Sequence, residues 1–182
     1  MLGPPASGKG TQGRRLAEHL GVPHVSTGWL LRRSIDDGDP HGVRDLVMQG
    51  RKVPDDVVEA VLVPALADGF VLDGYPRTHH QAHRLDVLLE GSGRALDAAI
   101  ELTVDEETLV VRMVMRADAE KRSDDRPEVF MHRLDEYRSD ILGLRKHYGD
   151  RLVAVDSHGD PDEVFERLAL ALHLTSPARP RR

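Results

Sequence analysis

The sequence predicts an α/β fold in which helices flank a parallel sheet. Short apolar runs typical of buried strands alternate with helical segments of roughly 10–20 residues, as they do in sheets of parallel strands. The chain also begins on a glycine-rich loop, residues 3–11, that leads directly into a helix. Its 182 residues show no internal repeat and suffice for one domain with a single core.

Helices and strands alternate in the first half of the chain. Leu16 and Leu20 lie four residues apart on one helix face, and Gly21 ends that helix. Pro64 should disturb the last helix of this half, because proline cannot donate the backbone hydrogen bond of a helix interior. The helices are expected at 9–20, 27–37, 41–49 and 55–67, and the strands at 22–26 and 69–73.

The second half continues this alternation. Residues 117–126 are charged and lack apolar periodicity, which predicts a surface loop. Pro127 suits the first turn of the helix that follows, where its missing N–H would have no helical partner. Helices are expected at 78–89, 106–115, 127–148 and 162–173, strands at 98–104 and 152–155, and a disordered tail at 175–182.

Composition excludes several functional classes. Without cysteine the chain forms no disulfide, Cys-ligated zinc site, iron–sulfur cluster or thiol nucleophile, and we expect no structural zinc. A net charge of −6 argues against a general nucleic-acid binder. No apolar run approaches the roughly 20 residues of a membrane span, and the first residues lack the pattern of a signal peptide. We therefore expect a cytoplasmic protein that binds neither nucleic acid nor membrane.

The glycine-rich loop follows the phosphate-binding pattern G-x-x-x-x-G-K, with the Thr11 hydroxyl one position later than in the strict form. Gly3 and Gly8 allow the backbone to curl so that successive N–H groups point inward. The following helix adds its partial positive charge, and Lys9 supplies a mobile charge to the β- and γ-phosphates. Thr11 offers a hydroxyl near the phosphates and Mg²⁺. A plain glycine-rich turn is the alternative.

Several arginines are candidates for contacts with phosphate, because binding a polyanion needs positive charge. Arg112 and Arg116 lie four residues apart on one helix face. Asp73 closes a predicted strand, where it either organises a Mg²⁺ shell, directly or through water, or caps a turn. Each arginine has the alternative of being an ordinary solvated surface charge. The remaining candidates follow predicted strand ends or occupy the polar loop and the next helix: Arg32, Arg77, Arg122 and Arg133.

Four motifs together resemble the adenylate kinase family of nucleoside monophosphate kinases, over nearly the whole chain. They are GPPASGKGTQ (3–12), STGWLLR (26–32), GFVLDGYPRTHHQA (69–82) and the arginine-bearing segment 112–133. The resemblance implies a P-loop three-layer fold with a central parallel five-stranded sheet flanked by helices. Only Met1 and Leu2 precede the loop where the family has a buried strand of roughly five residues, so we expect a truncated first strand and a true start upstream.

By resemblance, the chain moves the γ-phosphoryl group of Mg-ATP to AMP, giving two ADP. The implied catalytic residues are Lys9, Asp73, Arg77, Arg112, Arg116, Arg122 and Arg133. The implied ATP site is Gly3, Ser7, Gly8, Lys9, Gly10, Thr11, Arg112 and Arg116. The implied AMP site is Thr27, Arg32, Arg51, Val53, Gly74, Arg77, Gln81, Arg122 and Arg133. The implied Mg²⁺ shell involves Thr11 and, through water, Asp73.

The resemblance also divides the single domain, 1–182. It implies a core (1–26, 69–116 and 128–174), an AMP-binding helical insert (27–68) and a short lid (117–127) that closes over the phosphates. Thr27 and Gln81 match the adenine-selecting pattern, since a glutamine amide pairs with both the donor and the acceptor edge of adenine. We expect a monomer that acts on ATP, AMP and ADP.

Two alternatives stay open at this point. One is a kinase of the UMP/CMP type, and the other is a nucleotide-binding protein with impaired catalysis. The short first strand and Trp29 suggest the second, because Trp29 stands where the family usually has aspartate. Trp29 is expected to pack on or partly cover the AMP pocket. Ala6 replaces the glycine most common at its position.

Overall fold

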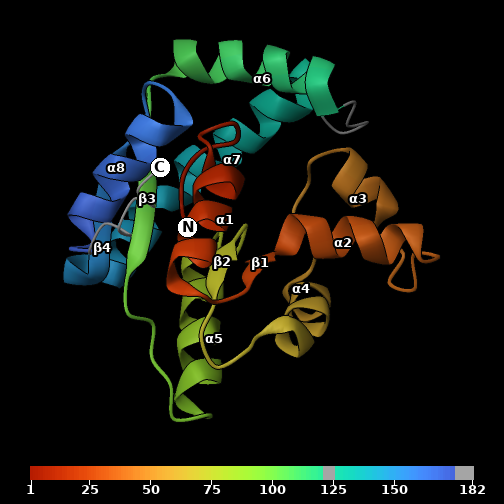
Figure 1. Ribbon diagram of the computed structural model, residues 1–182. Helices are drawn as coiled ribbons and strands as arrows, with labels where there is room; N and C mark the ends of the chain where they lie inside the picture. Colours follow the sequence, from red (N-terminus) through yellow and green to blue (C-terminus); the bar gives the residue numbers. More distant parts are fainter. Residues whose placement is uncertain (121–125, 175–182) are drawn as a thin grey trace, which may run out of the picture.

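The computed structural model describes residues 1–120 and 126–174, the side chains of 116–120 excepted. Helices and short parallel strands alternate along it as the sequence predicts (Figure 1). The strands are β1 (His24–Ser26), β2 (Val71–Asp73), β3 (Ala99–Thr103) and β4 (Leu152–Asp156). The predicted mixed α/β class is therefore confirmed.

The strands of the described residues form two parallel pairs. β1 pairs with β2, and β3 pairs with β4. Met1 and Leu2 lie between the pairs: the Met1 nitrogen donates to the Leu72 carbonyl at 2.6 Å, and Leu2 exchanges hydrogen bonds with Ile100 and Leu102 of β3. The segment therefore links the two pairs through an isolated parallel bridge to β3 and one hydrogen bond to β2.

Helices pack around these strands. The part of the chain that the structure describes contains no helix with the length and apolar character needed to cross a membrane. Short 3₁₀ turns, η1 (Val63–Ala65) and η2 (Gly149–Arg151), follow α4 and α7. The helices are α1 (Lys9–Leu20), α2 (Thr27–Asp36), α3 (Arg44–Met48), α4 (Asp55–Leu62), α5 (His79–Glu90), α6 (Glu106–Glu120), α7 (Pro127–Tyr148) and α8 (Pro161–Ala171).

Several helix boundaries differ from the prediction, while α1 and α7 match it. Residues 117–120, predicted as loop, continue α6, because alanine and glutamate are strong helix formers. α4 is shorter than expected, because the chain tightens into η1 around Pro64. α3 begins later than expected, where the Asp39 carboxylate accepts the backbone N–H groups of Val43 and Arg44. The predicted tail, 175–182, lies outside the described residues.

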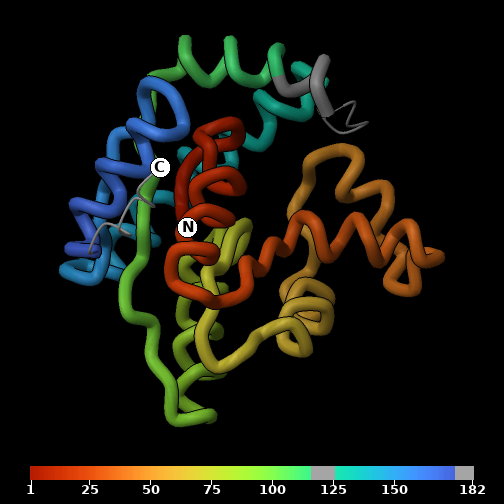
Figure 2. Tube along the Cα trace, viewed as in Figure 1, coloured from red at the N-terminus to blue at the C-terminus, as the bar shows by residue number. Residues whose placement is uncertain are grey.

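The core has separate clusters in the body, which contains the strands, and in an arm beside it, which is formed by α2, α3 and α4. Leu16, Leu102 and Leu168 are buried around β3 and β4. Leu31 and Leu62 belong to a second cluster, which reaches α5. Figure 2 shows the chain leaving the body after β1, running through α2, α3 and α4, and returning into β2. This arm covers the residues expected as the AMP-binding insert.

Candidate functional site

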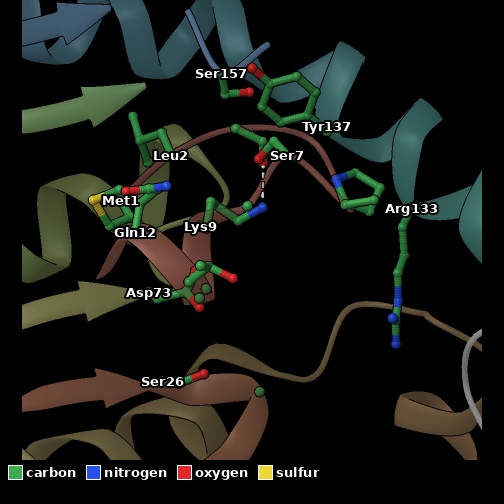
Figure 3. Close-up of a pocket in the computed structure, with 18 of the residues that line it drawn as sticks. Met1, Leu2, Ser7, Lys9, Gln12, Ser26, Asp73, Arg133, Tyr137 and Ser157 are labelled. Carbon is green, nitrogen blue, oxygen red and sulfur yellow. Dashed lines mark hydrogen bonds between the residues drawn. The ribbon is translucent and has the colours of Figure 1, made fainter. Parts of the chain in front are cut away.

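A cleft of about 1120 Å³ opens where the strands end (Figure 3). Its lining includes Ser26 at the end of β1, Asp73 at the end of β2 and Ser157 just after β4. Most of loop 3–11 contributes to the same lining. Parallel sheets commonly bind ligands at this edge, because the carboxyl ends of their strands meet there.

Glycines curl the loop tightly before α1. Gly3 has a φ of 138° and Gly8 a φ of 92°, a conformation that L side chains rarely adopt. A Cβ atom on Gly3 would lie 2.8 Å from the Leu102 carbonyl oxygen, so a larger residue would collide with β3. Lys9 folds back over the loop, and its Nζ donates to the Gly3 and Pro4 carbonyls at 2.9 and 2.7 Å. The curled loop ends at a helix N-terminus, as a phosphate-binding loop requires.

Oxygen atoms gather beside the loop. Asp73 is 9% exposed, and its Oδ1 has no hydrogen-bond partner among the described residues. Gly10 approaches this carboxylate closely, since a Cβ atom there would lie 3.6 Å from Oδ2. Thr11 is exposed and lines the cleft, and the buried Ser7 hydroxyl lies beside Gly3. Oxygen donors of this kind are the ligands that Mg²⁺ prefers, so the residues present fit the expected ion.

Three of the arginines that line the cleft come from different parts of the chain: Arg32 of α2, Arg77 after β2, and Arg133 of α7. Arg77 Nε donates to the Gly74 carbonyl at 3.0 Å. Arg77 is accessible from the cleft, yet protein surrounds it closely enough that desolvation lowers its pKa. Arg133 and Arg32 lower this pKa further, and Asp73 opposes them. A cluster of mutually repelling cations is a favourable site for a polyanion.

Arg112 reaches the cleft from α6. Its Nη2 donates to the carbonyls of Ser157 and Gly159 at 2.7 and 3.2 Å, which holds the guanidinium beside the segment after β4. Arg116 lies one turn later on α6, with a side chain outside the described residues, and Arg122 lies outside them entirely. The residues that line the cleft from the predicted ATP site are Gly3, Ser7, Gly8, Lys9, Gly10, Thr11 and Arg112.

A smaller cavity of about 70 Å³ opens beside the arm. Thr27 is buried there, and its Oγ1 donates to the Asp73 carbonyl at 3.3 Å. Gly74 has a φ of 83°, and a Cβ atom on it would lie 2.5 Å from Thr27 Oγ1, so this close approach requires glycine. The predicted AMP residues that line this cavity are Thr27, Arg32, Arg51, Val53, Gly74, Arg77, Gln81 and Arg133.

Gln81 makes hydrogen bonds that the sequence did not predict. Its Oε1 accepts the backbone N–H of Arg77 at 2.7 Å, and its Nε2 donates to the Asp55 carboxylate at 2.7 Å. An amide oxygen has two lone pairs and an amide nitrogen has two hydrogens, so each atom retains the capacity for one further bond.

Sequence reasoning missed the contacts that tie the arm to α7. Lys52 forms an ion pair with Asp140, and it lines both the cleft and the smaller cavity. Arg133 Nη2 also donates to the Val47 carbonyl at 3.3 Å. The basic segment containing Lys52 was the only signal available, because its carboxylate partner lies 88 residues later in the chain.

Trp29 lines the cleft and not the smaller cavity. It is 52% exposed, and the Arg33 guanidinium lies 5.2 Å from its ring centroid. The ring is therefore half-exposed at the cleft and lies outside the lining of the smaller cavity.

Comparison with known proteins gives consistent matches. The family model described as adenylate kinase matches residues 1–153. A protein of Corynebacterium glutamicum named adenylate kinase is 40% identical, with 94% of this chain and 97% of the relative covered. Relatives of the same name from Xanthomonas euvesicatoria and Mycobacterium bovis are 43% and 42% identical over the same shares. The resemblance expected from the four motifs is confirmed.

Proposed function

We propose that the cleft holds two nucleotides, since this chain belongs to the adenylate kinase family. The enzyme transfers the γ-phosphoryl group of ATP to AMP and gives two ADP. The observation that carries the proposal is that the cleft and the smaller cavity share Arg32, Arg77 and Arg133. Cations common to both spaces lie where the phosphates of two nucleotides meet. ATP accordingly occupies the side of loop 3–11, and AMP the side of the arm.

On the ATP side, the backbone N–H groups of the loop and the start of α1 hold the phosphates. Lys9 is bound to the Gly3 and Pro4 carbonyls in the structure. It exchanges these acceptors for phosphate oxygens, whose full charges bind an ammonium more strongly than neutral carbonyls do. Arg112 contributes a further charge, and Arg116 extends the same helix face.

Asp73 and Thr11 organise Mg²⁺ when the nucleotide is bound. The partnerless Oδ1 of Asp73 supports an acceptor role, directly or through water. The ion supplies charge neutralisation at the β- and γ-phosphates. The protein supplies an oxygen at a fixed place, because Asp73 ends β2 and packs beside α1.

On the AMP side, Arg32, Arg77 and Arg133 hold the phosphate. Thr27, Gln81 and the backbone around Gly74 face the base, with Arg51 and Val53 completing the pocket. The phosphate oxygen of AMP is itself the nucleophile, so catalysis consists of bringing two polyanions together and stabilising the transferred group. Arg122, proposed to join this set, lies outside the described residues.

The division of the domain follows from this arrangement. Residues 27–68 form the AMP insert, 117–127 the short lid, and 1–26, 69–116 and 128–174 the core. The hydrogen bonds of Met1 and Leu2 with β2 and β3 support a five-membered parallel arrangement as the scaffold. We propose that the enzyme acts as a monomer in the cytoplasm, where a chain without cysteine suits the reducing conditions.

A monophosphate panel tests the proposal. Coupled assays with ATP as donor compare AMP, UMP, CMP and GMP as acceptors. We expect kcat/KM to be highest for AMP, because the Gln81 amide presents both a donor and an acceptor to adenine. Equal or better use of UMP or CMP would contradict the proposed base site.

A further inference from the structure

His158 lies between two carboxylates at the edge of the cleft. Its Nε2 contacts the carboxylate of Asp105, and its Nδ1 contacts Oδ1 of Asp156. A carboxylate only accepts hydrogen bonds, and a neutral imidazole has a single N–H. Both contacts are therefore hydrogen bonds only when the imidazole is protonated.

Asp105 caps the first turn of α6. Its Oδ1 accepts the backbone N–H of Thr108 at 2.7 Å, its Oδ2 accepts the Thr108 hydroxyl at 3.1 Å, and its carbonyl accepts the N–H of Leu109. Asp156 ends β4. His158 thus links the start of α6 to the end of a neighbouring strand.

The residues on either side of His158 hold the same helix at a second point. The carbonyls of Ser157 and Gly159 accept hydrogen bonds from Arg112, seven positions after Asp105 on the chain. Seven residues span about 10 Å of an α-helix. The segment 157–159 therefore fixes both the first turn of α6 and the arginine that α6 directs to the cleft.

Neighbouring charges set the protonation of His158. Asp105 first and Asp156 second raise its pKa, and desolvation opposes them. From α8, Arg167 pairs with Asp156 Oδ2 at 3.0 Å and donates to the His158 carbonyl.

Other acids near the segment are already engaged. Asp160 accepts the backbone N–H groups of Asp162 and Glu163, and the Glu163 carboxylate accepts the N–H of Asp160. The His158 side chain is 45% exposed, so it exchanges its proton with solvent.

We propose that protonated His158 is a positioning residue that clamps the first turn of α6 to the end of β4 and thereby holds Arg112 toward the phosphates of ATP. The proposal rests on the proposed phosphate role of Arg112. Loss of the proton breaks one of the two hydrogen bonds and loosens the first turn of α6. ATP binding then weakens as pH rises through the pKa of His158, which lies above its usual 6.5.

His158→Gln tests the clamp, because glutamine carries no charge at any pH. KM for ATP is measured for both proteins from about pH 6 to about pH 9, a range that brackets imidazole titration. The ratio of the two values at each pH cancels the titration of ATP itself. We expect the KM of His158→Gln divided by the KM of the wild type to be about two to five at low pH, because an exposed ion pair contributes a free energy of that order. This ratio should fall toward one at high pH. KM for AMP should not differ between the proteins. A ratio for ATP that does not change with pH would overturn the proposal.

Two further variants sharpen the result. His132→Gln is the matched control, since His132 is 48% exposed and contacts Glu136 at 3.6 Å within the same helix. It should leave the pH profile of ATP binding unchanged. His158→Arg keeps a permanent charge with several donors, and it should retain the low KM for ATP at high pH. An NMR titration should show a His158 pKa above 6.5 that falls in Asp105→Asn.

Arg112→Ala tests the proposed phosphate role of Arg112 separately from the proposed His158 clamp. We expect it to raise KM for ATP, and an unchanged KM would refute the role proposed for Arg112. If Arg112→Ala weakens ATP binding while His158→Gln follows the wild type at every pH, the clamp alone is wrong.

Discussion

The Gln81 side chain accepts the backbone N–H of Arg77 at 2.7 Å. The residue proposed to face adenine therefore also fixes the backbone of the arginine proposed to hold the AMP phosphate. Its other amide atom donates to Asp55 at the start of α4, inside the arm. The proposed base site, the proposed phosphate site and the arm are joined through one buried amide.

Gln81→Leu should weaken AMP binding beyond the loss of base contacts. The substitution removes the acceptor for Arg77 N–H and the donor to Asp55. We expect KM for AMP to rise, KM for ATP to stay close to wild type, and the free energy of unfolding to fall by about 1–3 kcal/mol. Steady-state kinetics and urea denaturation measure these effects. An AMP KM equal to that of the wild type would show that Gln81 only supports the fold.

Lys9→Ala should abolish most transfer without destabilising the protein. We expect kcat to fall by about 10²–10³, as when one charge-stabilising donor is removed from a reaction centre. Thermal unfolding should change little, because the hydrogen bonds to the Gly3 and Pro4 carbonyls are only part-buried and water can replace the ammonium there. Lys146→Ala is the control, since Lys146 is exposed on α7. Undiminished turnover in Lys9→Ala would refute the role of the loop.

The sequence predicted much of this site because its motifs are local. Glycine conformations determine the backbone of loop 3–11, and the end of β2 determines where the segment around Arg77 lies. Contacts between distant segments left no such pattern. The ion pair of Lys52 with Asp140 and the contact of His158 with Asp105 depend on how α7 and the segment after β4 pack.

Helix ends show the same limit. Residues 117–120 lack apolar periodicity and were predicted as loop, but their intrinsic helix propensity extends α6. Periodicity reports which face of a helix is buried, whereas helix propensity reports which residues favour the helical backbone, so the two signals need not end at the same residue.

Arg77→Ala should act on AMP more than on ATP. Arg77 lines both the cleft and the smaller cavity, beside Arg32 and Arg133. Loss of a charge-assisted contact to phosphate predicts a rise in KM for AMP of roughly tenfold or more. Arg138→Ala is the control, because Arg138 is exposed and pairs with Asp135 and Glu106 away from the cavity. An unchanged KM and kcat with AMP would count against the assignment.

Asp73→Asn should raise the Mg²⁺ concentration needed for activity. An amide oxygen binds a divalent cation more weakly than a carboxylate, because it carries no net charge. Binding of ATP measured by calorimetry in the presence of a chelator should change much less. Magnesium titrations of turnover in the two proteins provide the measurement. If the half-saturating Mg²⁺ concentration is the same in both, Asp73 has no part in holding the ion.

The cap of α6 should lose its contribution to stability in acid. Backbone hydrogen bonding by Thr108, followed by His158, lowers the pKa of Asp105 to about 2, below its usual 3.8. A depressed carboxyl pKa stabilises the folded state above pH 3.8, and this contribution disappears as pH falls toward 2. Asp105→Asn keeps an oxygen to accept the Thr108 N–H but removes the charge. Its Tm should therefore lie below that of the wild type near pH 5, and the difference should shrink toward pH 2.

Asp68→Asn, an exposed change between η1 and β2, controls for the loss of one negative charge. The Tm difference between Asp105→Asn and the wild type should also shrink at high pH, because neutral His158 no longer attracts the carboxylate charge. A deficit that is constant from acid to alkaline pH would mean that the Asp105 charge stabilises neither the helix nor its contact with His158. A Tm difference that shrinks at both low and high pH distinguishes a charged cap paired with an imidazolium from a charged cap that acts alone.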